Sequence, residues 1–184
     1  MERKMMTRWI CAVMMLTAAF SAAWGIEFDY SVWYGGGTSA KVSVAAEPNA
    51  MGDEAGLKFT AEPASKKETF ACTSHTFKSP ADMTAFKSIE FSVKADHTIS
   101  IMLSLDCEGG SLVGSWRQET AGNEFKKFTF NRASMKINGK PDLSKVKALA
   151  IGFGTWEFDT TKEGFTAIVA GIKVIDSPAA DTQK

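Results

Sequence analysis

Apolar and polar side chains alternate along several short stretches of the chain. In Ser88–Lys94 the odd-numbered positions are apolar and the even-numbered positions are polar. Thr98–Cys107 shows the same alternation over ten positions. Successive side chains of a β-strand point to opposite faces of a sheet, so each stretch predicts a strand with one face on a core and the other toward water.

Further alternating segments follow. Phe128 and Phe130, and also Leu149–Phe153, share this pattern, and Gly164–Ile175 predicts a long final strand. The apolar parity of that strand changes near Ala170–Gly171, which indicates a β-bulge. Weaker strand candidates are Lys41–Ala46, Leu57–Ala61 and Glu68–Phe77. We expect the core to contain Ile89, Phe91, Val93, Ile99, Ile101, Leu103, Leu105, Phe128, Phe130, Leu149, Ile151 and Phe153.

Turn-forming residues separate these segments, and no sustained helical stripe is present. Ala81–Phe86 and Leu143–Val146 predict a single helical turn each at most. Short strands with regular turns predict an all-β fold, an antiparallel two-sheet β-sandwich. The predicted turns are Gly35–Gly37, Glu62–Pro63, Gly109–Gly110, Asn138–Gly139 and Lys140–Pro141.

The two ends of the chain differ from this pattern. A net positive start precedes the apolar stretch Trp9–Phe20 and the small residues of Ser21–Gly25. This order of segments predicts a bacterial-type secretory signal peptide over residues 1–25. A membrane-spanning helix is less suitable, because the apolar stretch is too short to cross a membrane. An uncleaved anchor is the alternative. We expect a secreted or periplasmic protein, with one sandwich domain over residues 26–176 and a disordered tail over 177–184.

Composition narrows the classes of partner. The chain has 184 residues, with 21 basic and 21 acidic side chains. Nucleic-acid binding requires a basic footprint, which this balance does not provide. After the leader, no apolar run approaches the length of a membrane helix, so we expect no membrane span in the mature chain.

Two cysteines, Cys72 and Cys107, follow the leader. Outside the cytosol a disulfide between them would persist, and closing a loop of this length stabilises by about 3–4 kcal/mol in the chain-entropy model. The alternative is a pair of buried free thiols, since cysteine also behaves as a small apolar residue.

The stretch from Phe77 to Asp176 resembles a jelly-roll family. Pro80–Lys94 reads P-A-D-M-T-A-F-K-S-I-E-F-S-V-K, which is similar to the family run D-L-T-x-F/Y-K-x-I/L-x-F-x-V-K. A Trp-bearing strand, Glu124–Phe130 and the D-L-S-K-V segment of Pro141–Ile151 continue the resemblance. These are features of the galactose-binding-like β-sandwiches. That family includes non-catalytic carbohydrate-binding modules and the complex I intermediate-associated protein 30 domain.

The resemblance implies a structural calcium in some members, held near an acidic last strand. Here the matching stretch Ile168–Ile172 has no carboxylate. Calcium takes six to eight oxygen ligands. Glu27, Asp29 and Asp176 can supply some of them, but we predict no cofactor.

Catalytic signatures are weak. His75 and His97 lack metal-type spacing, and no G-x-S-x-G elbow occurs. His97 lies in a predicted turn between two strands. The many carboxylates guarantee candidate pairs for glycoside hydrolysis but select none. We therefore predict that the protein is not an enzyme, with a small hydrolase as the last of three functions.

Tryptophan and tyrosine are the best candidates for ligand binding, because their rings stack on apolar sugar faces and keep a polar atom at a wet edge. Trp116 is the first choice, with Gly114 leaving room beside it and Arg117 and Gln118 offering donors. A core or rim tryptophan is the alternative.

Other aromatics are second choices. Trp33 and Tyr34 precede the glycine run and are interpreted either as core aromatics of a hairpin or as an aromatic platform at a sandwich edge. Trp156 lies in a predicted loop, where it either packs under the sandwich or faces a partner.

Two predicted strands have small, polar outward faces. These are Ser88, Glu90, Ser92 and Lys94 on one strand and Ser100, Met102, Ser104 and Asp106 on the next. A solvated face is the simpler interpretation, and a groove between short side chains is the alternative. We expect a polysaccharide or glycan as the partner, and a protein partner in an assembly role as the second hypothesis.

Overall fold

The computed structural model describes residues 26, 28–37, 41–62, 70–117, 120–154 and 163–176. The signal peptide, the tail, Glu27, Gln118 and Trp156 lie outside these ranges, so the expectations for them stay predictions. Among the described residues, no helix is long and apolar enough to cross a bilayer.

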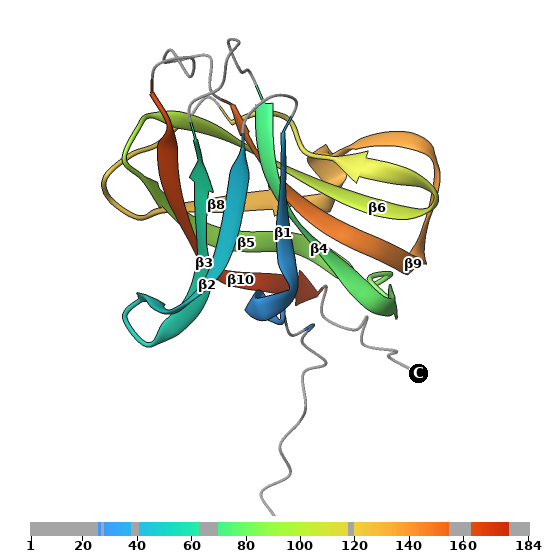
Figure 1. The fold of residues 1–184 in the computed structure, drawn as a ribbon. Coiled ribbons are helices and arrows are strands. Elements are labelled where there is room, and N and C mark those ends of the chain that lie inside the picture. Colours follow the sequence, from blue (N-terminus) through green and yellow to red (C-terminus); the bar gives the residue numbers. More distant parts are fainter. Residues whose placement is uncertain are drawn as a thin grey trace, which may run out of the picture.

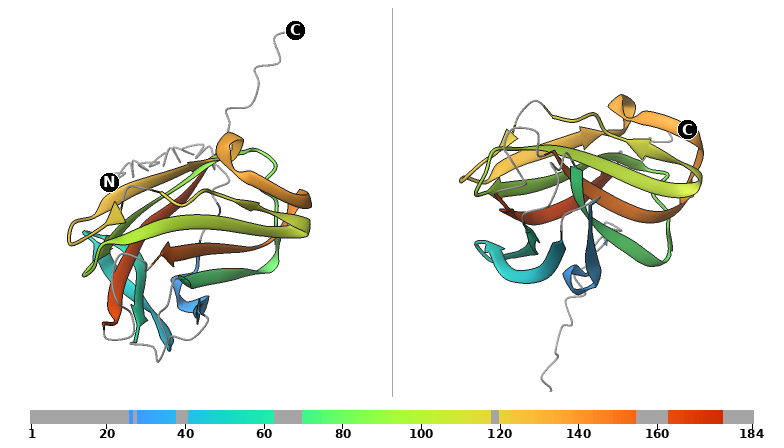
Figure 2. Two further views of the ribbon diagram at one scale, coloured as in Figure 1. Left: turned by 90° about the horizontal axis from the view of Figure 1, so that it is seen from above. Right: turned by 45° about the horizontal axis from the view of Figure 1, so that its top comes forward.

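Ten antiparallel strands of the described chain form two five-stranded sheets that face each other (Figures 1 and 2). The predicted all-β sandwich is confirmed. Two short 3-10 turns, η1 (Tyr30–Val32) and η2 (Arg132–Ser134), precede β1 and β9. In spatial order, sheet A contains β1 (Trp33–Gly37), β4 (Phe70–Ala81), β9 (Lys136–Gly154), β6 (Ile99–Val113) and β7 (Thr120–Ala121). Sheet B contains β2 (Val42–Met51), β3 (Glu54–Ala61), β10 (Phe165–Asp176), β5 (Phe86–Ala95) and β8 (Lys126–Asn131).

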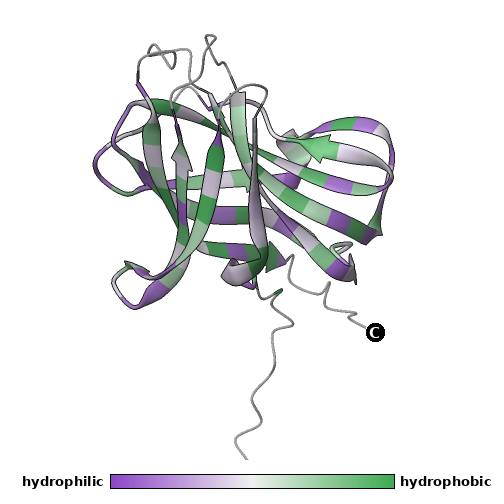
Figure 3. Ribbon diagram, viewed as in Figure 1, coloured by the Kyte–Doolittle hydropathy of each residue, from purple (hydrophilic) through white to green (hydrophobic). Residues whose placement is uncertain are grey.

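The core lies between the sheets, as the alternation predicts. Every predicted core residue is at most 2 % exposed, and Figure 3 shows apolar and polar positions alternating along the strands. Phe59 of sheet B and Phe153 of sheet A bring their ring centroids to 4.6 Å, which joins the two layers directly. Burying one such side chain stabilises the fold by about 1.5–3 kcal/mol.

The bulge predicted in the last strand is confirmed. The pairing of β10 with β5 shifts between Ala170 and Lys173, and Gly171 has a φ of 62°. A left-handed φ suits glycine because it has no Cβ. The extra residue restores inward parity, so that Ile172 follows Val169 into the core.

Three predicted turns lie instead inside long strands, Gly109–Gly110 in β6 and both Asn138–Gly139 and Lys140–Pro141 in β9. Gly35–Gly37 likewise belongs to β1. Gly109 and Gly139 have φ values of 78° and 72°, and Gly110 pairs with Gly139 across β6 and β9. The glycines bend both strands at the same place while pairing resumes beyond it, so they mark a bend rather than an end. The helical turn considered at Leu143–Val146 is wrong for the same reason, because that segment belongs to β9.

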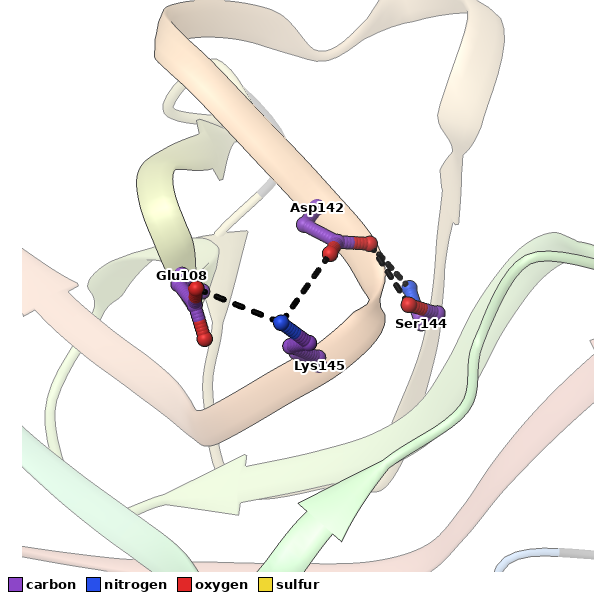
Figure 4. Close-up of polar contacts among 4 residues, drawn as sticks. All are labelled: Glu108, Asp142, Ser144 and Lys145. Carbon is purple, nitrogen blue, oxygen red and sulfur yellow. Dashed lines mark hydrogen bonds and ion pairs between the residues drawn. The ribbon is translucent and has the colours of Figure 1, made fainter.

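A small ionic network stabilises this bend (Figure 4). Glu108 and Asp142 are opposite each other in the ladder, where like charges repel. The Lys145 ammonium lies between them, 3.3 Å from the Glu108 carboxylate and 3.9 Å from that of Asp142. Asp142 also accepts hydrogen bonds from the Ser144 hydroxyl and backbone N–H, and these lower the pKa of its carboxyl.

The cysteines form no disulfide, so that interpretation is wrong. Both thiols are free, with Cys107 buried and Cys72 half-buried. Cys72 pairs with Gly152, and Gly152 pairs with Met102 on the far side of β9. A whole strand therefore separates the strands that carry the two thiols. Burial raises the pKa of both thiols, which disfavours the reactive thiolate.

Candidate functional site

The outer face of sheet A is lined mainly by small, uncharged side chains. On β4, β9 and β6 the intervening residues point into the core, which fixes the outward set by alternation. The ladder aligns Tyr34, Ser74, Ala150 and Ser104 in one row across four strands. We call this surface the sheet A face. Its members are Tyr34, Gly36, Cys72, Ser74, Thr76, Met102, Ser104, Asp106, Ala148, Ala150 and Gly152.

Tyr34 lies on β1, at one edge of the sheet A face. Its side chain is 53 % exposed, and its hydroxyl lies 3.2 Å from the Thr76 hydroxyl on β4. This contact makes the ring lean over the neighbouring strand. An aromatic surface therefore stands beside a floor of small side chains.

Trp116 lies at the other edge of the sheet A face. The Gly114 N–H donates to the Leu103 carbonyl and the Arg117 N–H to the Ile101 carbonyl, at 2.8 and 3.0 Å. These bonds hold residues 114–117 alongside β6, although they do not form the expected Trp-bearing strand. Trp116 is half-buried there.

Gly114 and Arg117 have a packing role that the sequence analysis missed. A Cβ at Gly114 would collide with the Phe130 ring. The Arg117 guanidinium lies 4.6 Å from the centroid of the same ring, and it donates to the Thr129 carbonyl. The two residues thus fit around Phe130 of β8, and the guanidinium turns toward that strand.

Trp33 differs from its neighbour Tyr34. It is only 6 % exposed, and its ring centroid lies 5.4 Å from that of His75 and 6.1 Å from that of Phe28. The structure therefore places Trp33 in the core, which was one of the two interpretations of this pair. Alternation explains the split, because adjacent residues of β1 point to opposite faces.

His75 belongs to this buried aromatic cluster behind the sheet A face. It is 5 % exposed, and its ring also packs against Phe77 at 4.8 Å. Its Nδ1 and the Trp33 Nε1 are buried, and neither atom has a hydrogen-bond partner among the described residues. Burial lowers the pKa of His75, and the Asp29 carboxylate opposes that effect weakly.

The two small polar faces expected from the sequence belong to different sheets. Ser104 and its neighbours lie on sheet A, whereas Glu90 and its neighbours on β5 lie on sheet B. On sheet B, Glu90 pairs with Lys127 at 2.6 Å and Glu54 pairs with Lys173 at 2.8 Å. These charged pairs are typical of a solvated surface.

Metal and catalytic candidates do not converge in the described part of the chain, where no cluster of three or more His, Cys, Asp or Glu could hold an ion. The Asp29 carboxylate instead caps η1 through the Ser31 hydroxyl and N–H, and these bonds lower its pKa. His97 lies in the turn between β5 and β6, as expected, within 3.0 Å of Asp96 and 3.4 Å of Glu163.

Comparison with known proteins places this geometry in context. No protein-family model matches the sequence, and no curated protein does either. Solved structures match the fold. The family 11 carbohydrate-binding module from Clostridium thermocellum, solved with a β-1,3-1,4-mixed-linked tetrasaccharide, has a TM-score of 0.57 at 17 % identity, over 79 % of this chain and 89 % of that one.

The fold is similar to the β-sandwich of carbohydrate-binding modules. The family 30 module of a C. thermocellum cellulosomal cellulase has a TM-score of 0.58 at 13 % identity, over 79 % of this chain and 92 % of that one. An exo-β-agarase matches with a TM-score of 0.55 at 15 % identity, over 83 % of this chain but only 24 % of its own length. The resemblance to the intermediate-associated protein 30 domain stays a prediction.

Proposed function

We propose that the protein is a non-catalytic carbohydrate-binding domain that holds a glycan across the sheet A face. One observation carries the proposal. A nearly uncharged floor of small side chains lies between an exposed Tyr34 on β1 and Trp116 beside β6. The fold shared with carbohydrate-binding modules supports the same function.

The chemistry of this face suits a sugar chain. Apolar C–H faces of sugars stack on aromatic rings, and Tyr34 exposes such a ring at one edge of the sheet A face. In this proposal the Trp116 ring serves the same role at the other edge. Hydroxyls such as those of Ser104 and Thr76 both donate and accept hydrogen bonds, which matches sugar hydroxyls. Side chains this short leave the backbone of the sheet within reach of a ligand.

The predicted signal peptide supports a secreted or periplasmic location, where a polysaccharide is accessible to the protein. In this proposal the chain binds its ligand without cleaving it. The protein-binding assembly role remains the alternative, and a small hydrolase is ranked last.

The test is a glycan-array screen of the secreted protein, followed by calorimetry with the best ligand. Ser104→Arg places a long charged side chain on the sheet A face and should abolish binding. Ser92→Arg is the matched control, because Ser92 is also half-buried on an outer strand face but belongs to sheet B. Absence of binding across the array, or equal loss from both variants, would refute the proposal and favour a protein partner.

A further inference from the structure

A recess lies at one end of the sandwich. It has a volume of about 600 Å³ and lies between η2 and the ribbon that β6 and β9 form beyond their bend. None of the residues that line it belongs to the sheet A face. A ligand bound here would therefore be independent of the glycan proposal.

One wall of the recess is apolar. Leu112 and Ile137 pair across β6 and β9, so their side chains share one face of the ribbon. Leu112 is 3 % exposed, whereas Ile137 is 65 % exposed. Met135 and Leu143 extend the wall. An apolar surface thus continues from the core into solvent.

The charge of the recess is positive. Among the described residues that line it, Asp142 is the only acid, and its oxygens contact Ser144 and Lys145, as described for the bend. Arg132 and Lys140 also line the recess, and among the described residues neither forms an ion pair. Arg132, Lys140 and Asp142 together give the described lining a net positive charge beside the apolar wall.

Arg132 is held in place by neutral groups. One guanidinium nitrogen donates to the Thr84 carbonyl at 2.7 Å, and the guanidinium carbon lies 5.5 Å from the Phe86 centroid. A guanidinium has five N–H donors, so most remain available for a ligand. An oriented donor loses little conformational freedom when it binds an anion.

We propose that this recess binds a small carboxylate with an apolar body, either an alkyl chain or an aromatic ring. The apolar body lies against Leu112 and Ile137, and the carboxylate pairs with Lys140 and Arg132. The volume lies within the range of small-molecule sites, about 300–1,000 Å³, which combine mostly apolar walls with a few polar groups. Charge-assisted hydrogen bonds to a carboxylate are the strong ones among such contacts.

The test compares acids with amides of the same shape. Octanoate and 3-phenylpropanoate are titrated into the full chain, with octanamide and 3-phenylpropanamide as neutral partners, by ligand-observed NMR and calorimetry. Each acid that binds should do so about tenfold more tightly than its amide, the equivalent of about 1.4 kcal/mol. Preference for the octyl or the phenyl pair identifies the apolar body.

Substitutions locate the site. Lys140→Gln and Arg132→Gln should each weaken the acids by about tenfold and leave the amides unchanged. Ile137→Asn should weaken acids and amides alike and should fold normally, because that side chain is mostly exposed. Lys58→Gln and Ile175→Asn, on exposed positions of β3 and β10, are the matched controls. Equal affinity for acid and amide, indifference to both cation substitutions, or no binding of any probe would overturn the proposal.

Discussion

The outer faces of the two sheets differ in charge and in side-chain size. Sheet B carries long charged side chains, and Glu90 and Glu54 are neutralised by Lys127 and Lys173. The sheet A face has Asp106 as its one charged member. Both faces are made by the same alternation over a shared core, so packing alone does not explain the contrast.

A face that only has to stay soluble is well served by paired charges. Small side chains add little to solubility, but they leave a sheet open to close approach. The proposed function accounts for the difference, with the sheet A face suited to a ligand and the outer face of sheet B to water. Four experiments test which residues serve ligand binding and which serve only the stability or solubility of the fold.

The largest effect should come from the core side of β6. Leu103→Ala removes a fully buried side chain and should lower the free energy of unfolding by about 2–5 kcal/mol. Ser104→Ala, one residue along and on the sheet A face, should change it by less than about 0.5 kcal/mol. Urea denaturation of both variants measures this, and similar losses would mean that the face serves stability after all.

The next effect concerns glycan binding by the edge aromatics. Tyr34→Ala and Trp116→Ala should each cost about 2 kcal/mol of binding free energy, as truncation of a hot spot does. Both variants should keep the parent melting temperature. Early melting of Trp116→Ala would instead identify a packing tryptophan, for which about 3–5 kcal/mol of stability is expected.

Acid should weaken the fold through His75. Its pKa is lowered by burial, so below the ordinary value of about 6.5 the unfolded chain binds more protons than the folded one. Stability should therefore fall as the pH drops below about 6.5, by at most about 1.4 kcal/mol per pH unit for this one proton. His75→Phe, measured by thermal unfolding from pH 7 to pH 5, should lose that dependence. An unchanged pH profile would exclude His75 as its source.

The smallest effect should come from sheet B. A double-mutant cycle on Glu90 and Lys127 should give a coupling of about 0.2–1 kcal/mol that decreases with salt, because the lysine is largely exposed. The same variants should leave glycan affinity unchanged. A loss of affinity would show that the ligand uses the charged sheet.

The alternation of apolar and polar residues predicted the core, because the set of positions that faces inward can be read from each strand alone. It could not assign Trp33 and Tyr34 to their faces, since parity separates two neighbours without saying which one points inward. The disulfide failed for a different reason. Whether Cys72 meets Cys107 depends on strand order, and β9 lies between their strands.

The sequence predicted only part of the sheet A face, because the members of that face also depend on strand order. The sequence shows the small outward residues of β6, but Ser74 and Ala150 join them only once β4 and β9 are known to be neighbours. The packing role of Arg117 could not be predicted, because its partner Phe130 lies on the other sheet. In the sequence alone, Gly109 and Gly139 are typical of turns. The pairing of β6 with β9 shows that both lie within strands.

The glycine bend divides β6 and β9 into halves that can vary independently. The ladder is irregular between Asp106 and Gly110, so pairing restarts beyond that point. A residue inserted in the outer half would be absorbed there and would not invert the faces of the inner half. We therefore expect the ribbon around the recess to tolerate insertions and deletions while the sheet A face keeps its register.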